Sequence, residues 1–279
     1  MSAVINDKIV WPGNAACAVM LSVNLDAEFF GKIFYPDTDV DINSGDIFSL
    51  GRSGIEFGLP HLLDCFDQYN VKATFFVPGA VGARYPQAVR EIAARGHEIG
   101  CHGNMHELFA HLGAEEQRAA LKEAVDILTP LAGKRPAGFR MPEGEITEET
   151  LSIVKSMGFT YSSSLSDDDV PYIREPAGLM ELPIHWELFD LPCFVFAFDP
   201  PIPPGQSRSM EMNHVLRNWL YELEGARRFG TLMNLQLEPL ATGEQGRIFM
   251  LEKILDEIKR AGDVWIATGG EIAAFAQGV

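Results

Sequence analysis

Two histidines in one short segment are the side chains best suited to chemistry. His102 and His106 stand four positions apart, in a stretch that begins at His97. If this stretch forms a helical turn, both imidazoles point the same way and can bind one metal ion. The alternative is that both histidines lie in an exposed loop, or that one is packed in the core and the other is near it by chance.

A third ligand of a suitable type precedes them in the chain. Asp26 comes just after the apolar segment 16–23, which predicts a buried strand. Two histidines and one carboxylate, with positions left open for water, suit a catalytic Zn²⁺ and also Fe²⁺, Co²⁺, Mn²⁺ or Ni²⁺. Alternatively, Asp26 caps a helix or is a solvated loop residue. Taken together, the three side chains predict a divalent-metal site.

The segments that position these residues alternate between strand-like and helix-like patterns. Short apolar runs predict strands at 16–23, 72–77, 97–101, 137–140, 160–164, 182–184, 231–237 and 264–266. Helical periodicity and suitable end residues predict helices at 59–69, 86–95, 114–131, 147–157, 212–224 and 247–260. Repeated strand–helix units predict parallel strands with helices outside them, and seven or eight such units indicate an α/β barrel.

Polar residues follow several of these predicted strands. The functional residues of α/β barrels lie at the carboxyl ends of the strands. We therefore expect a single mouth to contain the five residues at these positions, which are Asn24, Asp26, His102, Arg140 and Glu238. Arg140 is expected to orient a carboxylate or to bind substrate, with a structural ion pair as the alternative.

Several motifs occur in the order and spacing of the polysaccharide deacetylase superfamily, also known for its NodB homology and its relation to carbohydrate esterase family 4. These motifs are Asn24-x-Asp26, Thr-Phe-Phe at 74–76, His-Glu-Ile-Gly-x-His at 97–102 followed by His106, and Arg140-Met-Pro. The chain resembles the cytoplasmic subgroup, which includes the Helicobacter-type peptidoglycan deacetylase, metal-independent allantoinases and cyclic imide hydrolases. The resemblance implies a distorted (β/α)7-8 barrel with a metal held by Asp26, His102 and His106.

Two positions depart from the pattern of this superfamily. Its catalytic base is the first aspartate of an Asp-x-Asp motif, where this chain has Asn24, and its general acid is a histidine, where this chain has Glu238. Since an amide cannot accept a proton from water, we expect Glu238 to take this proton and pass it to the leaving nitrogen. Glu28 and Glu145 are the next candidates, and Asn24 is expected to hydrogen-bond water or substrate. The alternative for Glu238 is a structural salt bridge.

Other segments are candidates for the walls of a substrate pocket. Glu145, His185 and Trp186 are the predicted substrate-binding residues, with core packing as the alternative for His185 and Trp186. Segment 30–53 lacks clear periodicity and is expected to form a lid over the mouth. The proline-rich segment 199–205 is expected to be a stiff loop that shapes a groove or an oligomer contact.

Composition restricts the class of protein and its partners. The chain has 279 residues, 47% of them hydrophobic, with no evident linker or repeat, which predicts a single catalytic domain over residues 1–279. A net charge of −17 disfavours nucleic acids and membrane surfaces as partners, because their phosphates would be repelled. Widely spaced cysteines and the lack of a signal-peptide pattern lead us to expect a cytoplasmic protein with reduced thiols. We also expect a homo-oligomer.

Three functions remain as hypotheses. The first is a metal-dependent hydrolase that cleaves the carbon–nitrogen bond of a small cytosolic amide, imide or ureide. It is favoured by the altered acid–base positions, the acidity and the lack of an export signal. The second is an N-deacetylase that acts on an N-acetylated sugar or on peptidoglycan. The third is a non-catalytic binding relative that lost its base when position 24 became asparagine.

Overall fold

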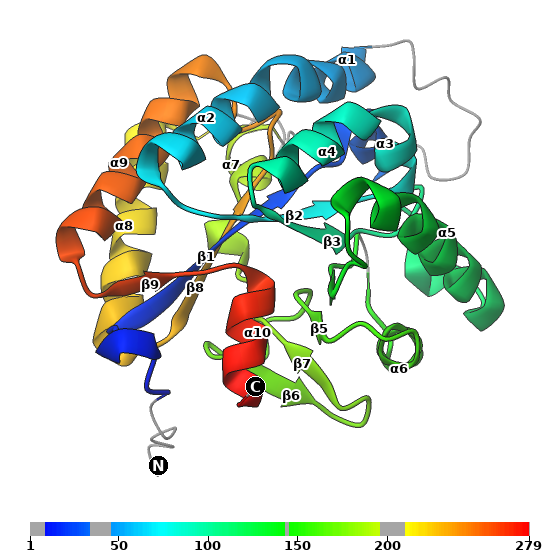
Figure 1. Ribbon diagram of the computed structural model, residues 1–279. Helices are drawn as coiled ribbons and strands as arrows, with labels where there is room; N and C mark the ends of the chain where they lie inside the picture. Colours follow the sequence, from blue (N-terminus) through cyan, green and yellow to red (C-terminus); the bar gives the residue numbers. More distant parts are fainter. Residues whose placement is uncertain (1–8, 34–45, 143–144, 196–209, 279) are drawn as a thin grey trace, which may run out of the picture.

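The computed structural model describes residues 9–33, 46–142, 145–195 and 210–278, and it has an α/β fold built on one curled sheet (Figure 1). The strands are β1 (Cys17–Asn24), β2 (Thr74–Val77), β3 (Glu98–Cys101), β4 (Gly138–Phe139), β5 (Tyr161–Ser162), β6 (Tyr172–Arg174), β7 (Leu179–Glu181), β8 (Leu232–Leu237) and β9 (Val264–Ile266). Their order across the sheet is β6-β7-β5-β4-β3-β2-β1-β8, and β9 pairs with the beginning of β1. All pairs are parallel except β6 with β7.

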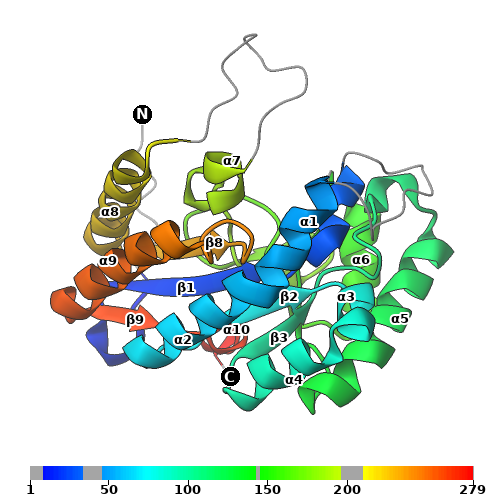
Figure 2. The same ribbon diagram turned by 90° about the horizontal axis from the view of Figure 1, so that it is seen from above.

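Helices surround this sheet, most of them on its outer side (Figures 1 and 2). They are α1 (Asp46–Ser53), α2 (Leu59–Tyr69), α3 (Gly79–Arg84), α4 (Pro86–Ala94), α5 (Ala114–Ala132), α6 (Glu148–Ser156), α7 (Asp190–Phe194), α8 (Met212–Phe229), α9 (Gln245–Ala261) and α10 (Gly269–Gln277). A π-helical turn at Gly54–Gly58 joins α1 to α2. Shorter 3-10 turns lie at Pro12–Asn14, Ala27–Ile33, Phe109–His111 and Trp186–Leu188.

The central strand β1 is covered by other side chains on both faces of the sheet. All eight of its residues are buried, as expected of a parallel strand. Its outer side chains, including Val19 and Leu21, join the largest apolar cluster with residues of α2, α8 and α9. Its inner side chains, including Met20, pack with Tyr161 and with Ile272 of α10. Helix α10 thus closes the end of the barrel at which the strands begin (Figure 1).

The predicted α/β class and the barrel-like arrangement of strands are confirmed, with one correction at the edge of the sheet. The paired segment near 182–184 is β7 at Leu179–Glu181, three residues earlier than predicted, and it forms an antiparallel hairpin with β6. The described strands form an open, curled sheet in which β6 and β8 are the ends of the order. Beyond β8, a parallel bridge from Phe189 to Gln236 continues the curvature.

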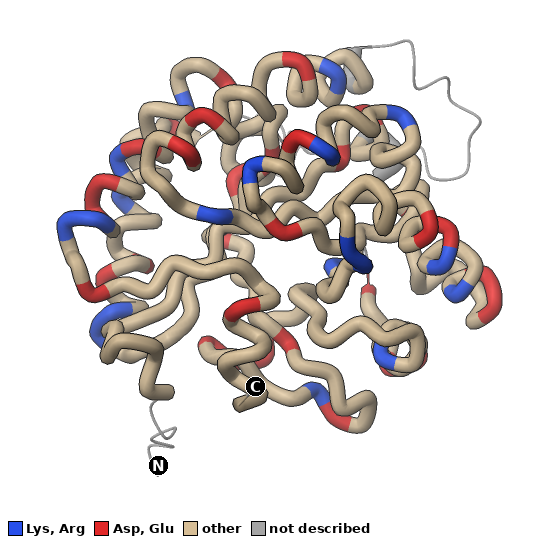
Figure 3. The backbone as a smooth tube through the Cα atoms, in the orientation of Figure 1, with Lys and Arg blue, Asp and Glu red and all other residues tan. Residues whose placement is uncertain are grey.

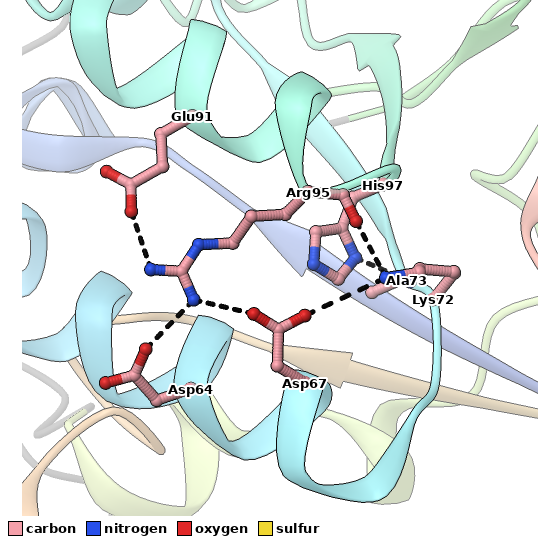
Figure 4. A network of polar contacts seen from close by, with 7 residues as sticks. All are labelled: Asp64, Asp67, Lys72, Ala73, Glu91, Arg95 and His97. Atoms are coloured by element: carbon pink, nitrogen blue, oxygen red, sulfur yellow. Dashed lines mark hydrogen bonds and ion pairs between the residues drawn. The ribbon is translucent and has the colours of Figure 1, made fainter.

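A polar network holds the amino-terminal ends of β2 and β3 to the surrounding helices (Figure 4). Arg95 donates to Asp64 at 2.9 Å, to Asp67 at 2.8 Å and to Glu91 at 2.7 Å. The nearby His97 is buried, and its Nδ1 accepts the Ala73 backbone N–H at 3.1 Å. This network lies at the opposite ends of the strands from Asn24 and His102.

The charged residues of the described chain lie mainly on the helices, where both signs are interspersed (Figure 3). Within the described ranges, no helix is long and apolar enough to cross a membrane. Of the segment expected to be a lid, 34–45 lie outside the described residues, while its end forms α1. The segment 199–205 also lies outside the described residues.

Candidate metal and active site

Three buried side chains from neighbouring strand ends converge on one point. Asp26 follows β1 and His102 follows β3, and both strands pair with β2. The Asp26 Oδ1 atom lies 3.5 Å from His102 Nε2, and Asp26 Oδ2 lies 3.2 Å from His106 Nε2. One potential ligand atom from each residue lies within 4.8 Å of the others, so the three can bind a single metal ion.

The loop that carries the two histidines is not the helical turn that the spacing suggested. His106 has a left-handed backbone with φ of 61°, and the segment between the histidines is irregular. The Glu107 carboxylate holds this conformation by accepting the N–H groups of Asn104 at 2.9 Å and Met105 at 2.8 Å. The N–H of Gly79 donates to the Gly103 carbonyl at 3.1 Å and ties the loop to α3.

The polar atoms of the cluster are suited to a cation. Among the described residues, Asp26 Oδ1 and His102 Nε2 are buried without a hydrogen-bond partner. Burial lowers the pKa of His102 to about 4, so its imidazole is neutral at physiological pH. The pKa of Asp26 is also lowered, because attraction to His106 and His102 outweighs the burial that opposes it. A carboxylate with two imidazole nitrogens is an appropriate donor set for a divalent metal.

Arg140 holds the side chain at position 24, beside the three candidate ligands. Its guanidinium is buried over the ring of Phe76, with 4.2 Å between the carbon centre and the ring centroid. It donates from Nη1 to Asn24 Oδ1 at 2.9 Å and from Nε to the Ser163 carbonyl at 2.9 Å. Because the Asn24 oxygen is occupied in this way, its amide nitrogen remains to donate towards the pocket.

Glu238 is the carboxylate that the fold places beside the three candidate ligands. It follows β8, which pairs with β1, and its side chain is buried against Asp26 and Asn24. Burial, with repulsion from Asp26 and Asp190, raises the pKa of Glu238 well above its ordinary value, while the Asn24 amide acts in the opposite direction. A carboxyl group with a raised pKa beside a metal site is a candidate to accept and donate protons.

An open pocket leads to these residues. Its polar floor consists of Asn24, Asp26, Arg140, Ser164, Gln236 and Glu238, and its apolar walls consist of Met141, Pro142, Ile184, Trp186 and Phe189. Trp186 is 69% exposed, so its indole is available to a ligand and is not core packing. Pockets with apolar walls and a few convergent polar groups are the usual form of a small-molecule site.

Three of the predicted site residues belong neither to the pocket lining nor to the cluster of Asp26 with the two histidines. The buried carboxylate of Glu28 accepts from Tyr85 at 2.7 Å and pairs with Arg84 at 2.6 Å. Glu145 is exposed and is not part of the pocket lining. His185 lines a separate depression beside α8, where its Nε2 lies 3.4 Å from Asp169. The geometry therefore favours Glu238 over the two other carboxylates as the proton carrier.

Several residues of the pocket were not predicted from the sequence. Gln236 stands two positions before Glu238 on β8, so both point to the same face of the strand. Polar residues at 234 and 236 in an otherwise apolar strand were the signal that could have identified this inward face. Ser164 follows β5 as His102 follows β3, and it could have been found from the same strand-end rule.

Comparisons relate this chain to known proteins. Residues 53–162 match the polysaccharide deacetylase family. The chain is 27% identical to the peptidoglycan deacetylase of Helicobacter pylori over 263 residues, which cover 83% of this chain and 87% of that protein. A crystal structure from Mycobacterium smegmatis, described as a polysaccharide deacetylase, has a TM-score of 0.88 at 32% identity and covers 97% of this chain and 93% of that chain. Puue allantoinase shares the fold with a TM-score of 0.80 at 22% identity, over 94% of this chain and 91% of its own.

Proposed function

Because the chain belongs to the polysaccharide deacetylase family, we propose that it is a metal-dependent N-deacetylase that removes the acetyl group from an N-acetylated sugar. At the coarser level, it is a hydrolase of carbon–nitrogen bonds other than peptide bonds. The observation that carries the proposal is the pocket floor, where Glu238 lies beside Asp26, which is itself clustered with His102 and His106.

The deacetylase function is better supported than a small imide or ureide substrate. The two relatives with higher identity, at 27% and 32%, are described as deacetylases. The allantoinase shares 22% identity and therefore supports the fold alone. The change at position 24 prompted the expectation of a different substrate, but Glu238 supplies a carboxylate at the same pocket floor.

The proposed metal ligands are Asp26, His102 and His106. A bound divalent cation supplies Lewis acidity, which polarises the acetyl carbonyl and lowers the pKa of water. The protein residues fix the geometry around it. The Arg140 carbonyl accepts from His102 Nδ1 at 2.9 Å, which directs the lone pair of Nε2 towards the cluster. This donor set suits several divalent ions.

Glu238 is the proposed proton carrier of the reaction. It accepts a proton from the attacking water and then donates one to the leaving sugar nitrogen, so that the amine departs neutral. Asn24 cannot exchange a proton at this step, because an amide is not basic at ordinary pH. Its oxygen accepts from the guanidinium of Arg140, and its amide lowers the pKa of Glu238. Glu238 lines the same pocket as Asp26.

The pocket walls also suit a sugar. The exposed indole of Trp186 offers a flat apolar surface to the face of a pyranose ring, while the polar floor receives the acetamido group. The other apolar residues that line the same pocket are Met141, Pro142, Ile184 and Phe189.

The proposal is tested with purified protein, N-acetylglucosamine oligomers and added Zn²⁺, Co²⁺ or Mn²⁺, by measuring released acetate and new free amines. Glu238→Gln preserves shape and removes basicity, so turnover should fall by about 10²- to 10⁴-fold while metal content is unchanged. Glu145→Gln is the matched control, because Glu145 is exposed and does not line the pocket. Hydrolysis of cyclic imides or hydantoins without deacetylation would reject the proposed substrate. Binding of the oligomers without turnover at any metal loading would instead indicate a non-catalytic relative.

A further inference from the structure

We propose that Asp190 is a positioning residue that holds Glu238 in place by binding the main chain of the turn that carries it. This inference rests on the proposed role of Glu238 as the proton carrier. Asp190 lies at the start of α7, which follows the parallel bridge between Phe189 and Gln236 of β8. Helix α7 is thereby brought alongside the carboxyl end of β8, although 48 positions separate Asp190 from Glu238.

The contacts of Asp190 are made to the turn itself. Its Oδ2 accepts the backbone N–H of Glu238 at 2.9 Å and the backbone N–H of Thr242 at 3.0 Å. Within the turn, the Glu238 carbonyl accepts the N–H groups of Ala241 and Thr242, both at 2.9 Å. A single carboxylate oxygen therefore connects the beginning and the end of the turn that places Glu238 in the pocket.

The environment of Asp190 is unusual for a residue that only caps a turn. Its side chain is 0% exposed, and its second oxygen, Oδ1, has no hydrogen-bond partner among the described residues. Burial raises its pKa to about 7. Burying a carboxylate costs free energy of folding. A neutral side chain such as asparagine could accept the same two N–H groups at a smaller free-energy cost. Repulsion between Asp190 and Glu238 also raises the pKa of Glu238, so the two carboxyl groups influence each other directly.

The expected consequence follows from the need for accurate placement. Glu238 must reach both the attacking water and the leaving nitrogen from one position. A displacement of about 1 Å can lower catalysis by about 10²-fold. Loss of Asp190 removes both main-chain contacts to the turn, and Glu238 should then move away from Asn24. Because Asp26, His102 and His106 lie on other loops, metal binding should be largely unaffected.

The test compares Asp190→Ala with Asp190→Asn, in both the native and the Glu238→Gln background. Asp190→Ala should lower kcat by about 10- to 100-fold with KM within about threefold, because only the position of Glu238 is lost. Asp190→Asn retains an oxygen acceptor, so its kcat should stay within about fivefold of the native value. In the Glu238→Gln background, Asp190→Ala should cause no further loss, because residues that act as a unit are not additive.

Glu211→Ala is the matched control. The exposed Glu211 carboxylate also accepts two backbone N–H groups, from Asn213 at 2.9 Å and His214 at 3.0 Å, at the start of α8. Loss of this carboxylate should lower the free energy of unfolding and leave kcat unchanged. Crystal structures of Asp190→Ala and Asp190→Asn provide a readout that does not depend on turnover. Glu238 should be displaced in Asp190→Ala and retained in Asp190→Asn.

The outcomes separate this inference from the proposed function. An unmoved Glu238 in Asp190→Ala, or an equal loss of kcat in both backgrounds, overturns the positioning role of Asp190. A Glu238→Gln variant with native turnover rejects Glu238 as the proton carrier, whatever the result for Asp190. If the native protein deacetylates no sugar, the proposed function fails, and the two crystal structures still decide whether Asp190 positions Glu238.

Discussion

The Nδ1 atom of His102 lies 2.9 Å from the backbone carbonyl oxygen of Arg140. A carbonyl only accepts hydrogen bonds, so Nδ1 carries the proton and Nε2 presents its lone pair to the cluster with Asp26. The same arginine donates from its guanidinium to Asn24. Arg140 therefore orients one proposed metal ligand with its main chain and position 24 with its side chain.

The first prediction concerns the proposed metal ligands. His106→Ala should weaken binding of Zn²⁺ by at least about 10²-fold and abolish turnover, because two ligands do not retain a catalytic metal. Metal content after dialysis, measured by elemental analysis, checks this result. The control is His111→Ala, since His111 is an exposed residue of the next 3-10 turn. Native protein that hydrolyses substrate without any bound metal would contradict the prediction.

The second prediction concerns the conformation of the histidine loop. Glu107→Ala removes both acceptors that hold the N–H groups of Asn104 and Met105, so His106 should lose its left-handed conformation in the metal-free protein. The dissociation constant for Zn²⁺ should rise about 10- to 100-fold, as is usual when a ligand loses its supporting contacts. Calorimetric titration measures it. Glu116→Ala is the control, because Glu116 caps a different segment by accepting the Gly113 N–H. Equal effects of the two variants would contradict a specific role for Glu107.

The third prediction concerns the packing behind Glu238. A Cβ atom at Gly58 would lie 2.0 Å from the Pro239 carbonyl oxygen, so only glycine allows the π-helical turn to approach the turn after Glu238. Gly58→Ala should lower the free energy of unfolding by about 1–3 kcal/mol and should reduce kcat by displacing Glu238. Urea denaturation and steady-state kinetics provide the two measurements.

A glycine in open space provides the matched control for that substitution. Gly225 lies within α8, and no heavy atom would lie within 4 Å of an added Cβ. Gly225→Ala should therefore stabilise the protein by up to about 1 kcal/mol, through helix propensity and a less flexible unfolded chain. Native stability and kcat in Gly58→Ala would show that the two turns are not packed as described.

The fourth prediction concerns pH and the buried His97. Burial lowers its pKa from 6.5 to about 4, so the folded protein binds this proton less readily than the unfolded chain. The contribution of His97 is therefore fully present above pH 6.5 and is lost as the pH falls towards 4. The loss amounts to at most about 3 kcal/mol.

His97→Asn tests this contribution. The asparagine oxygen can accept the Ala73 N–H in place of Nδ1, but it does not titrate. The free energy of unfolding of both proteins is measured by urea denaturation. As the pH decreases from 6.5 to 4, the native protein should lose stability relative to the variant. A difference that stays constant over this range would show that His97 is protonated equally in both states.

Several features could be predicted from local sequence. The continuous apolar run of β1 and the alternation of strands with helices predicted parallel strands, because burial on both faces requires apolar residues at every position. The strand-end positions of Asp26 and His102 then predicted that their side chains would lie close together. The hairpin of β6 with β7 was not predicted, because its three-residue strands carry too little periodicity.

The resemblance placed Glu238 ahead of two other carboxylates, because it stands where the superfamily has a histidine. The environments of Glu28, Glu145 and Glu238 could be known only from the tertiary structure. Glu28 is occupied by Arg84, Glu145 is exposed, and Glu238 is buried against Asp26.

The chain by itself determined the types of side chain available and the strands that carry them, because these depend on composition and short-range periodicity. Only the tertiary structure decided that Asp190 would bind the main chain at Glu238, that His106 would adopt a left-handed conformation, and that Trp186 would stand at the pocket wall. Each of these depends on distances between segments far apart in the chain or on the fit of neighbouring loops. Such distances arise from the packing of the whole sheet and its helices, which no local pattern encodes.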